Sequence, residues 1–123
     1  MPSADDYAKT VNRYLELVAN GSADDVTALY AEDATIEDPI GSELRRGRGA
    51  IHEFCAAFES AKRQTEMVSL RVGGNEAAFL WNLTIKAGDG GTVIEPISVM
   101  TFDADAKITS MRAFWSPADA RSV

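Results

Sequence analysis

Apolar residues recur at helical spacing in the first half of the chain and alternate with polar residues in the second half. The first amphipathic stretch covers residues 3–20, with charged side chains on its opposite face. Its apolar positions are Tyr7, Val11, Tyr14, Leu15 and Val18. Ser3 followed by Asp6 resembles a capping box, and Gly21 is typical of a helix end. The pattern predicts a helix that buries Tyr14 on its inner side.

Two shorter helices are predicted before the spacing changes. Ser22 is a favourable N-cap, and the two aspartates that follow suit the first turn of a helix. The inner side of this second helix is expected to carry Val26, Leu29 and Tyr30. A third helix is expected over about 50–62, after a loop rich in Gly and Arg. Its buried side chains are expected to be Ile51, Phe54, Cys55 and Phe58.

One short strand is predicted between the second and third helices, and it ends at Pro39. Successive side chains of a strand point to opposite faces, so Asp38 shares the apolar face of Ala34 and Ile36. Pro39 favours an extended backbone at Asp38 and removes a donor from the strand. A carboxylate at the rim of an apolar cavity is a plausible general base, whereas Asp before Pro also commonly begins a turn. From these residues alone, both interpretations of Asp38 stay open.

From residue 65 onward the apolar spacing is two, which predicts β-strands. The expected strands include residues 65–72, 79–86, 92–102 and 108–116, with Gly- or Asp-rich turns between them. The apolar faces are expected to carry Val68, Leu70 and Val72 in the first strand, Phe79, Trp81, Leu83 and Ile85 in the second, and Met111, Ala113 and Trp115 in the last.

Helices followed by an antiparallel meander predict an α+β fold. The apolar faces would be enclosed if three N-terminal helices closed the concave side of a strongly curved sheet. With 123 residues, the chain is expected to form one domain, residues 1–123, with a core large enough for a small cavity.

The strand predicted over 92–102 is apolar on both faces. One face carries Ile94, Pro96, Ser98 and Met100, and the other carries Val93, Glu95, Ile97, Val99 and Thr101. If the first face lines a cavity, Ile97 and Val99 need another cover, and a second copy of the chain is the simplest one. A β-bulge near Pro96 that disturbs the alternation is the competing explanation. We favour a homodimer formed through the outer face of the sheet.

Composition narrows the classes of function. A net charge of −7 disfavours binding to nucleic acid or to an anionic membrane surface. There is no apolar run of membrane-spanning length and no signal peptide, so a cytoplasmic protein is expected. Cys55 and His52 are the only cysteine and histidine, which excludes an internal disulfide and the usual Cys- or His-rich metal sites. Any chemistry therefore falls to carboxylates and hydroxyls, and no cofactor is expected.

Four segments of the chain follow a known pattern, and they are Arg13–Val18, Leu29–Gly41, Asn75–Phe79 and Met111–Ser116. They resemble the bacterial Δ5-3-ketosteroid isomerases, and the resemblance extends nearly from end to end. It implies the cone-shaped α+β fold of the nuclear-transport-factor-like, cystatin-like or polyketide-cyclase-like superfamily. That fold also hosts cyclases, dehydratases, epoxide hydrolases and binding modules, so the resemblance in sequence, rather than the fold, indicates steroid isomerisation.

The resemblance also implies roles for individual residues. Asp38 matches the base that moves a proton from C4 to C6 of the steroid, and Tyr14 matches the hydrogen-bond donor to the C3 oxygen. Tyr30 matches a tyrosine that supports the catalytic tyrosine in some members. The apolar substrate slot is expected to include Cys55, Phe58, Trp81, Leu83, Met100 and Trp115. These roles are the known pattern of the family, and they require neither a metal nor an organic cofactor.

Two departures from the family pattern concern the second oxyanion donor and the hydroxyl network that adjoins Tyr14. Ser98 stands where the family has a protonated aspartic acid, and Cys55 stands where it usually has a tyrosine. A serine hydroxyl can still donate one hydrogen bond, although losing a well-aimed donor costs roughly 3 kcal/mol of transition-state stabilisation. The prediction is therefore a steroid Δ5-isomerase that uses Asp38, Tyr14 and Ser98. The alternatives are another carbon-acid enzyme, such as a polyketide cyclase, and a non-catalytic protein that binds apolar ligands.

Overall fold

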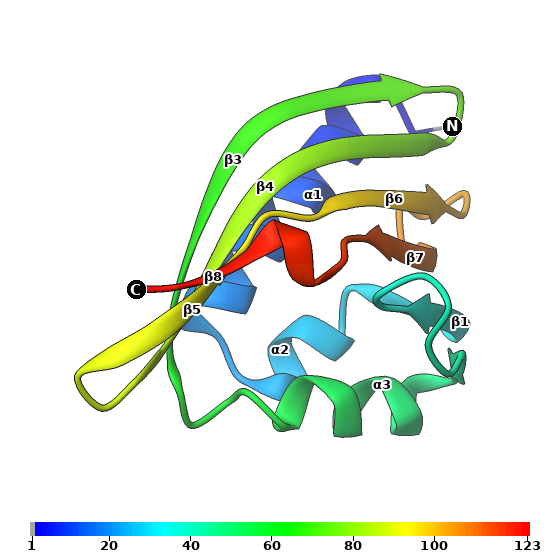
Figure 1. Cartoon of the computed structure of the whole chain (residues 1–123). Helices are drawn as coiled ribbons and strands as arrows, with labels where there is room; N and C mark the ends of the chain where they lie inside the picture. The colour runs from blue at the N-terminus through cyan, green and yellow to red at the C-terminus, as the bar shows by residue number, and fades with distance from the viewer. Residues whose placement is uncertain (1) are drawn as a thin grey trace.

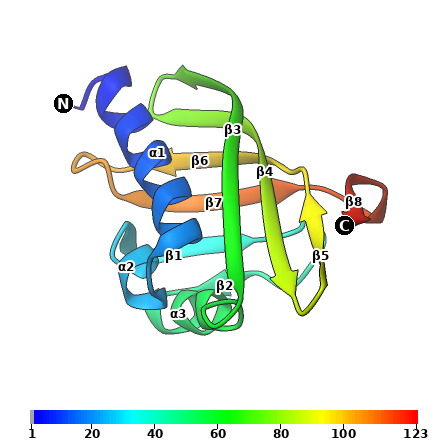
Figure 2. The same ribbon diagram turned by 90° about the vertical axis from the view of Figure 1, so that its left-hand side faces the viewer.

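The computed structural model describes residues 2–123 as an eight-stranded sheet with three α-helices on its concave side (Figures 1 and 2). The helices are α1 (Ala4–Asn20), α2 (Ala23–Thr27) and α3 (Arg48–Ala56), and a short 3₁₀ helix, η1 (Pro117–Asp119), lies near the C-terminus. The strands are β1 (Tyr30–Glu37), β2 (Arg45–Arg46), β3 (Lys62–Gly73), β4 (Glu76–Ala87), β5 (Gly90–Ile94), β6 (Ile97–Phe102), β7 (Ile108–Phe114) and β8 (Ala120–Ser122). The predicted α+β fold is confirmed.

The sheet is curved and does not close into a barrel. Its strand order is β2-β1-β7-β6-β4-β5-β8, and β3 pairs with β4. Strands β1 and β7 are parallel, whereas the other pairs are antiparallel. The long strands β3 and β4 bend along their length, and at the far end β3 begins near α3 whereas β4 runs into the hairpin with β5 (Figures 1 and 2). This curvature leaves room for a cavity between the sheet and the helices.

Helix α1 forms as its periodicity predicts. The Ser3 side chain accepts a hydrogen bond from the Asp6 backbone N–H, and the Asp6 carboxylate accepts one from the Ser3 N–H, which completes the capping box. Gly21 ends the helix, with its N–H donating to the Leu17 carbonyl at 2.7 Å. The buried side chains of α1 are Tyr7, Val11, Tyr14, Leu15 and Leu17. Tyr14 is therefore fixed on the inner side of a well-capped helix.

Helices α2 and α3 are shorter than predicted. Helix α2 ends at Thr27, and Tyr30 begins β1, so the inward position of Tyr30 comes from a strand and not from a helix. Helix α3 ends at Ala56, so Phe58 lies beyond it and is half-exposed. Sequence periodicity extended both helices too far because apolar residues after a helix end can still face the same core.

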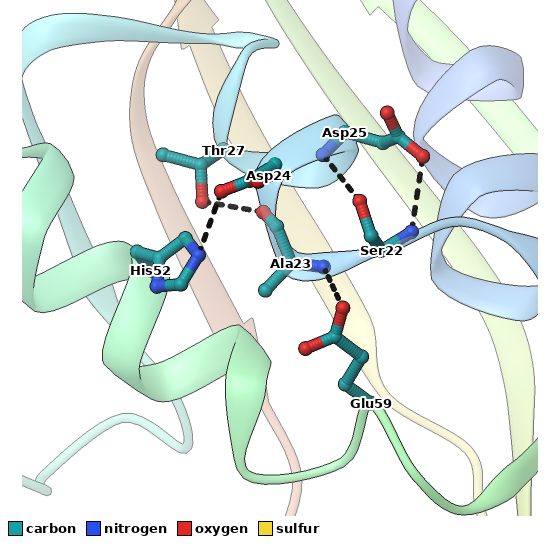
Figure 3. Close-up of polar contacts among 7 residues, drawn as sticks. All are labelled: Ser22, Ala23, Asp24, Asp25, Thr27, His52 and Glu59. Carbon is teal, nitrogen blue, oxygen red and sulfur yellow. Dashed lines mark hydrogen bonds and ion pairs between the residues drawn. The ribbon is translucent and has the colours of Figure 1, made fainter.

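Polar contacts join α2 to α3 and to the turn that follows α3 (Figure 3). His52 Nε2 lies 2.8 Å from Asp24 Oδ1, and Glu59 Oε1 accepts a hydrogen bond from the Ala23 N–H at 3.1 Å. The Ser22 side chain caps α2 through the Asp25 N–H. These contacts hold the start of α2 beside the end of α3.

The strand pattern was predicted in outline, with one error of alternation in β3 and one strand that is interrupted. The register between β3 and β4 shifts between Met67 and Ser69, so a bulge places Val68 on the outer face, where it is 53% exposed. Leu70 packs against the core as predicted. The expected strand over 92–102 is two strands, β5 and β6, because Glu95 and Pro96 interrupt it. Strand β8 and the short β2 were not predicted, since two or three residues carry no readable alternation.

The register across the interruption is continuous and contains no bulge. Leu80 of β4 pairs with Ile97 of β6, and Leu83 of β4 pairs with Ile94 of β5. The two pairs are three residues apart on each side, so no extra residue is inserted between β5 and β6. Pro96 and Ser98 are buried on the inner face, whereas Ile97 is exposed. The predicted alternation is confirmed from Pro96 to Met100, whereas Val93 of β5 is buried although it belongs to the other face. The bulge near Pro96 proposed as the competing explanation is wrong.

Candidate active site

A cavity of about 170 Å³ lies between the helices and the curved sheet. Its lining residues are Tyr14, Val18, Ser22, Ala23, Val26, Asp38, Phe54, Cys55, Phe58, Arg63, Trp81, Leu83, Ile85, Ile94, Pro96 and Trp115. Most of these side chains are apolar, and the few polar ones include Tyr14, Asp38 and Arg63. Asp38 and Tyr14 lie in the wall of the same cavity although they come from separate segments of the chain.

Asp38 follows directly after β1 and faces the cavity, as the strand alternation predicts. Ala34 and Ile36 are fully buried on the same face. The Trp115 indole N–H donates to Asp38 Oδ1 at 2.7 Å, and Trp115 itself follows β7, the parallel neighbour of β1. Burial raises the pKa of Asp38 above its ordinary value, while the Trp115 hydrogen bond and the charge of Arg45 oppose that shift. The result is an oriented carboxylate with increased affinity for a proton.

Tyr14 and Tyr30 are both buried, and their hydroxyl groups are close together. Burial, the charge of Asp38 and the nearby Cys55 raise the pKa of Tyr14, and a hydrogen bond with Tyr30 opposes the shift. Burial and the proximity of Tyr14 raise the pKa of Tyr30. The raised pKa of each hydroxyl keeps both tyrosines protonated at neutral pH, so each can donate a hydrogen bond. Tyr14 is therefore a neutral donor in the cavity wall.

Ser98 is fully buried and lies behind Trp81. The Trp81 indole N–H donates to Ser98 Oγ at 2.9 Å. The Trp81 ring lines the cavity and meets the Tyr14 ring edge to face, with the centroids 6.0 Å apart. Ser98 is not among the residues that line the cavity, so its side chain contacts the site through Trp81.

The remaining candidates from the sequence divide into two groups. Cys55, Phe58 and Leu83 line the cavity, whereas Met100 and Tyr30 are buried in the core next to it. Burial raises the pKa of the Cys55 thiol to about 11, although a hydrogen bond with Thr27 opposes the shift. Cys55 is therefore an uncharged part of the cavity wall at neutral pH.

Sequence reasoning missed Arg63 and several apolar lining residues. Arg63 belongs to β3, which begins at Lys62, three residues before the predicted start. The alternation of Arg63, Thr65 and Met67 with charged or amide side chains was the signal that could have placed it on the inner face. The alternation was not recognised because arginine side chains are mostly exposed to solvent, so Arg63 was not expected to face a cavity.

Two further features of residues 2–123 concern the class of site. No group of three His, Cys, Asp or Glu side chains in this part of the chain could hold a metal ion. No helix within it is long and apolar enough to cross a membrane.

Comparison with known proteins places the chain in a family. A model of the SnoaL-like domain matches residues 11–111. A protein from Nocardioides simplex named steroid Delta-isomerase is 56% identical over 109 residues, which cover 89% of each chain. The chain belongs to the SnoaL-like family. The resemblance read from the sequence is confirmed at this level.

Solved structures share the fold of this SnoaL-like protein over nearly its whole length. The epoxide hydrolase/cyclase-like enzyme SalBIII, described in pyran ring formation in the polyether salinomycin, has a TM-score of 0.90 at 28% identity and covers 98% of both chains. RV0760c from Mycobacterium tuberculosis also has a TM-score of 0.90, at 17% identity, and covers 100% of both chains. At that identity, the likeness to RV0760c concerns the fold alone.

Proposed function

We propose that this SnoaL-like protein is a steroid Δ5-isomerase that moves the C5–C6 double bond of a 3-oxo steroid into conjugation. The observation that carries the proposal is that a carboxylate and a neutral phenol, Asp38 and Tyr14, line one apolar cavity. The 56% identity to a steroid Delta-isomerase supports this reaction over others known for the fold. The substrate class is a small apolar ketone.

The proposed mechanism needs one base and one oxyanion donor. Asp38 removes a proton from C4, and the electron pair delocalises onto the C3 oxygen as a dienolate. Tyr14 donates a hydrogen bond to that oxygen where negative charge develops. Asp38 then returns the same proton to C6, which leaves the double bond between C4 and C5 and regenerates the carboxylate. Atoms and charge balance without a cofactor.

We assign smaller roles to the neighbouring polar groups. Trp115 orients the Asp38 carboxylate, and Tyr30 orients the Tyr14 hydroxyl. Ser98 accepts from Trp81, so its own proton is free to donate, but Trp81 lies between it and the cavity. We therefore propose that Ser98 assists less than Tyr14 does.

The direct test is to follow the absorbance of the conjugated enone with 5-androstene-3,17-dione as substrate. Enzyme-dependent growth of that absorbance supports the isomerase. The likeness to SalBIII at 28% identity keeps a cyclase-type carbon-acid reaction as the second candidate. Binding of a phenolic steroid without turnover would instead indicate a sequestering protein, and neither turnover nor binding would favour the cyclase.

Trp115→Phe is expected to move the acidic limb of the kcat/KM profile to higher pH. A hydrogen bond to a carboxylate favours its ionised form, so losing the Trp115 donor raises the pKa of Asp38 further. Because the base must be ionised, activity is then lost sooner as the solution is acidified. The measurement is kcat/KM against pH.

Trp81→Phe is the matched control for this shift. Trp81 lines the same cavity, but its indole N–H donates to Ser98 and not to Asp38. Its acidic limb should keep the wild-type position even if its rate falls. An unshifted limb in Trp115→Phe would contradict the role given to this hydrogen bond.

We further propose that the protein forms a homodimer through the outer face of the sheet. Ile97 and Phe114 are paired neighbours on β6 and β7, and they are 48% and 40% exposed. The Arg112 guanidinium lies 5.2 Å from the centre of the Phe114 ring. An aromatic, an aliphatic and an arginine side chain gathered on one face are typical of a protein interface.

The cytoplasmic location stays a prediction.

Ile97→Glu is expected to convert the dimer to monomers, because it would bury a charge in the proposed interface. Analytical ultracentrifugation would measure the mass of the wild type and the variant. Leu44→Glu is the control, since Leu44 is 50% exposed but lies in the loop after β1. A wild type that sediments as a single 13.3 kDa chain at high concentration would contradict the dimer.

A further inference from the structure

A cationic side chain lines the cavity and plays no part in the proposed proton transfer. Arg63 lies at the start of β3, opposite Ile85 of β4, and both side chains line the cavity. One terminal nitrogen of Arg63, Nη2, donates to the Gly21 carbonyl at 3.0 Å. Its Nε atom is buried and has no hydrogen-bond partner among residues 2–123. The guanidinium carries five N–H groups, and within residues 2–123 its one side-chain hydrogen bond comes from Nη2, so terminal donors remain for an acceptor in the cavity.

Arg63 lies far along the cavity from the groups that would handle the ketone. Trp81 touches the Tyr14 ring, and Ile85 is four residues farther along β4. At a rise of about 3.3 Å per residue, these positions are about 13 Å apart. Phe58, which lines the cavity and is 39% exposed, marks it as open to solvent. The distance along β4 suits an extended ring system with one oxygen at each end.

Arg63 has no ion-pair partner in residues 2–123. Glu59, which with Arg63 affects the pKa of Cys55, accepts a hydrogen bond from the Ala23 N–H through Oε1 instead (Figure 3). The charge of Arg63 lowers the pKa of the Cys55 thiol and the charge of Glu59 raises it, so the guanidinium acts on a group in the cavity wall. A guanidinium that is partly withdrawn from water gains most from an anionic partner, because charge-assisted hydrogen bonds are stronger than neutral ones.

We propose that Arg63 is a specificity-determining residue that binds a carboxylate at the end of the steroid opposite the 3-ketone. This inference rests on the proposed steroid isomerase function and makes it narrower. The preferred substrates are 3-oxo-Δ5 steroids that carry an acidic group on the five-membered ring or its side chain. The planar guanidinium already uses Nη2 on Gly21, and its other terminal nitrogen, Nη1, serves the ligand.

The test compares an acid with its own ester under conditions without turnover. The ligands are 3-oxoandrost-4-ene-17β-carboxylate and its methyl ester, which already carry the conjugated double bond. Quenching of the fluorescence of Trp81 and Trp115, which both line the cavity, measures Kd. The wild type is expected to bind the acid about tenfold more tightly than the ester. Since nothing is isomerised, the result does not depend on the catalytic proposal.

Variants assign the preference to Arg63. Arg63→Met should weaken binding of the acid by about tenfold and change the Kd of the ester by less than about twofold. Unchanged ester affinity also shows that the variant is folded. Arg71→Met is the matched control, because Arg71 lies on the same strand but is exposed, and its side chain donates to Ser69 and Leu70. It should keep the wild-type preference.

Arg63→Lys keeps the charge but loses the planar fork of N–H donors, so it should keep only part of the preference for the acid. Equal affinity of the wild type for acid and ester would overturn the inference. Equal weakening of both ligands by Arg63→Met would overturn it as well. Absence of enone formation with 5-androstene-3,17-dione would instead refute the isomerase and leave the anion preference to be judged by these Kd values.

Discussion

Asp38→Asn is expected to lower kcat for 5-androstene-3,17-dione by about 10²- to 10⁴-fold, the usual contribution of a general base. Asparagine has nearly the same shape but cannot accept the C4 proton. The Kd for a steroid should change little, because the cavity wall stays apolar around it. Stopped-flow or steady-state measurement of enone absorbance gives the rate, and tryptophan fluorescence gives the affinity.

Loss of folding cannot explain that expected result. Burial raises the pKa of Asp38, so the folded protein binds this proton more tightly than the unfolded chain does. The ionised carboxylate therefore reduces the stability of the fold at neutral pH, and this penalty disappears as the pH falls through the raised pKa. Asp38→Asn should consequently unfold at the same temperature as the wild type or at a higher one.

Asp33→Asn is the matched control for the base. Asp33 lies on the same strand, β1, but its side chain is exposed. Its kcat should stay within about twofold of the wild type, as for a surface substitution away from the site. Full activity in Asp38→Asn would remove the base assignment, whereas an equal loss in both variants would indicate a general effect of charge.

Tyr14→Phe is expected to lower kcat by about 10²- to 10³-fold, the effect of removing one well-placed oxyanion donor. The substitution removes a single hydroxyl and keeps the ring that packs against Trp81. Ser98→Ala should have a smaller effect, since Ser98 reaches the cavity through Trp81. The measurements are kcat and KM for each variant with the same substrate.

Tyr7→Phe is the control for the loss of a tyrosine hydroxyl from α1. Tyr7 is buried and stacks on Phe102, with the ring centroids 4.8 Å apart, but it does not line the cavity. Its activity should match the wild type. If Ser98→Ala were slower than Tyr14→Phe, the two donor roles would have to be exchanged.

Local patterns along the chain determined the elements and which face of each is buried. Helical spacing identified α1 and the inward position of Tyr14. Alternation identified the inner face of β4 and the side of the sheet to which Asp38 belongs. These predictions succeeded because side-chain direction follows from backbone periodicity, which is visible in a single sequence. The pairing of Asp38 with Tyr14 came from the resemblance to a family.

Only the tertiary structure decided which side chains meet. The hydrogen bond from Trp115 to Asp38 depends on the parallel pairing of β1 with β7, which an antiparallel meander did not predict. The contact of Trp81 with Ser98 depends on the register between β4 and β6. The position of Arg63 in the cavity depends on the bulge in β3. Because of this bulge, odd-numbered residues face inward before it, as Arg63 does, and even-numbered residues face inward after it, as Leu70 does. Register, bulges and strand order arise from long-range pairing, so no local window of sequence contains them.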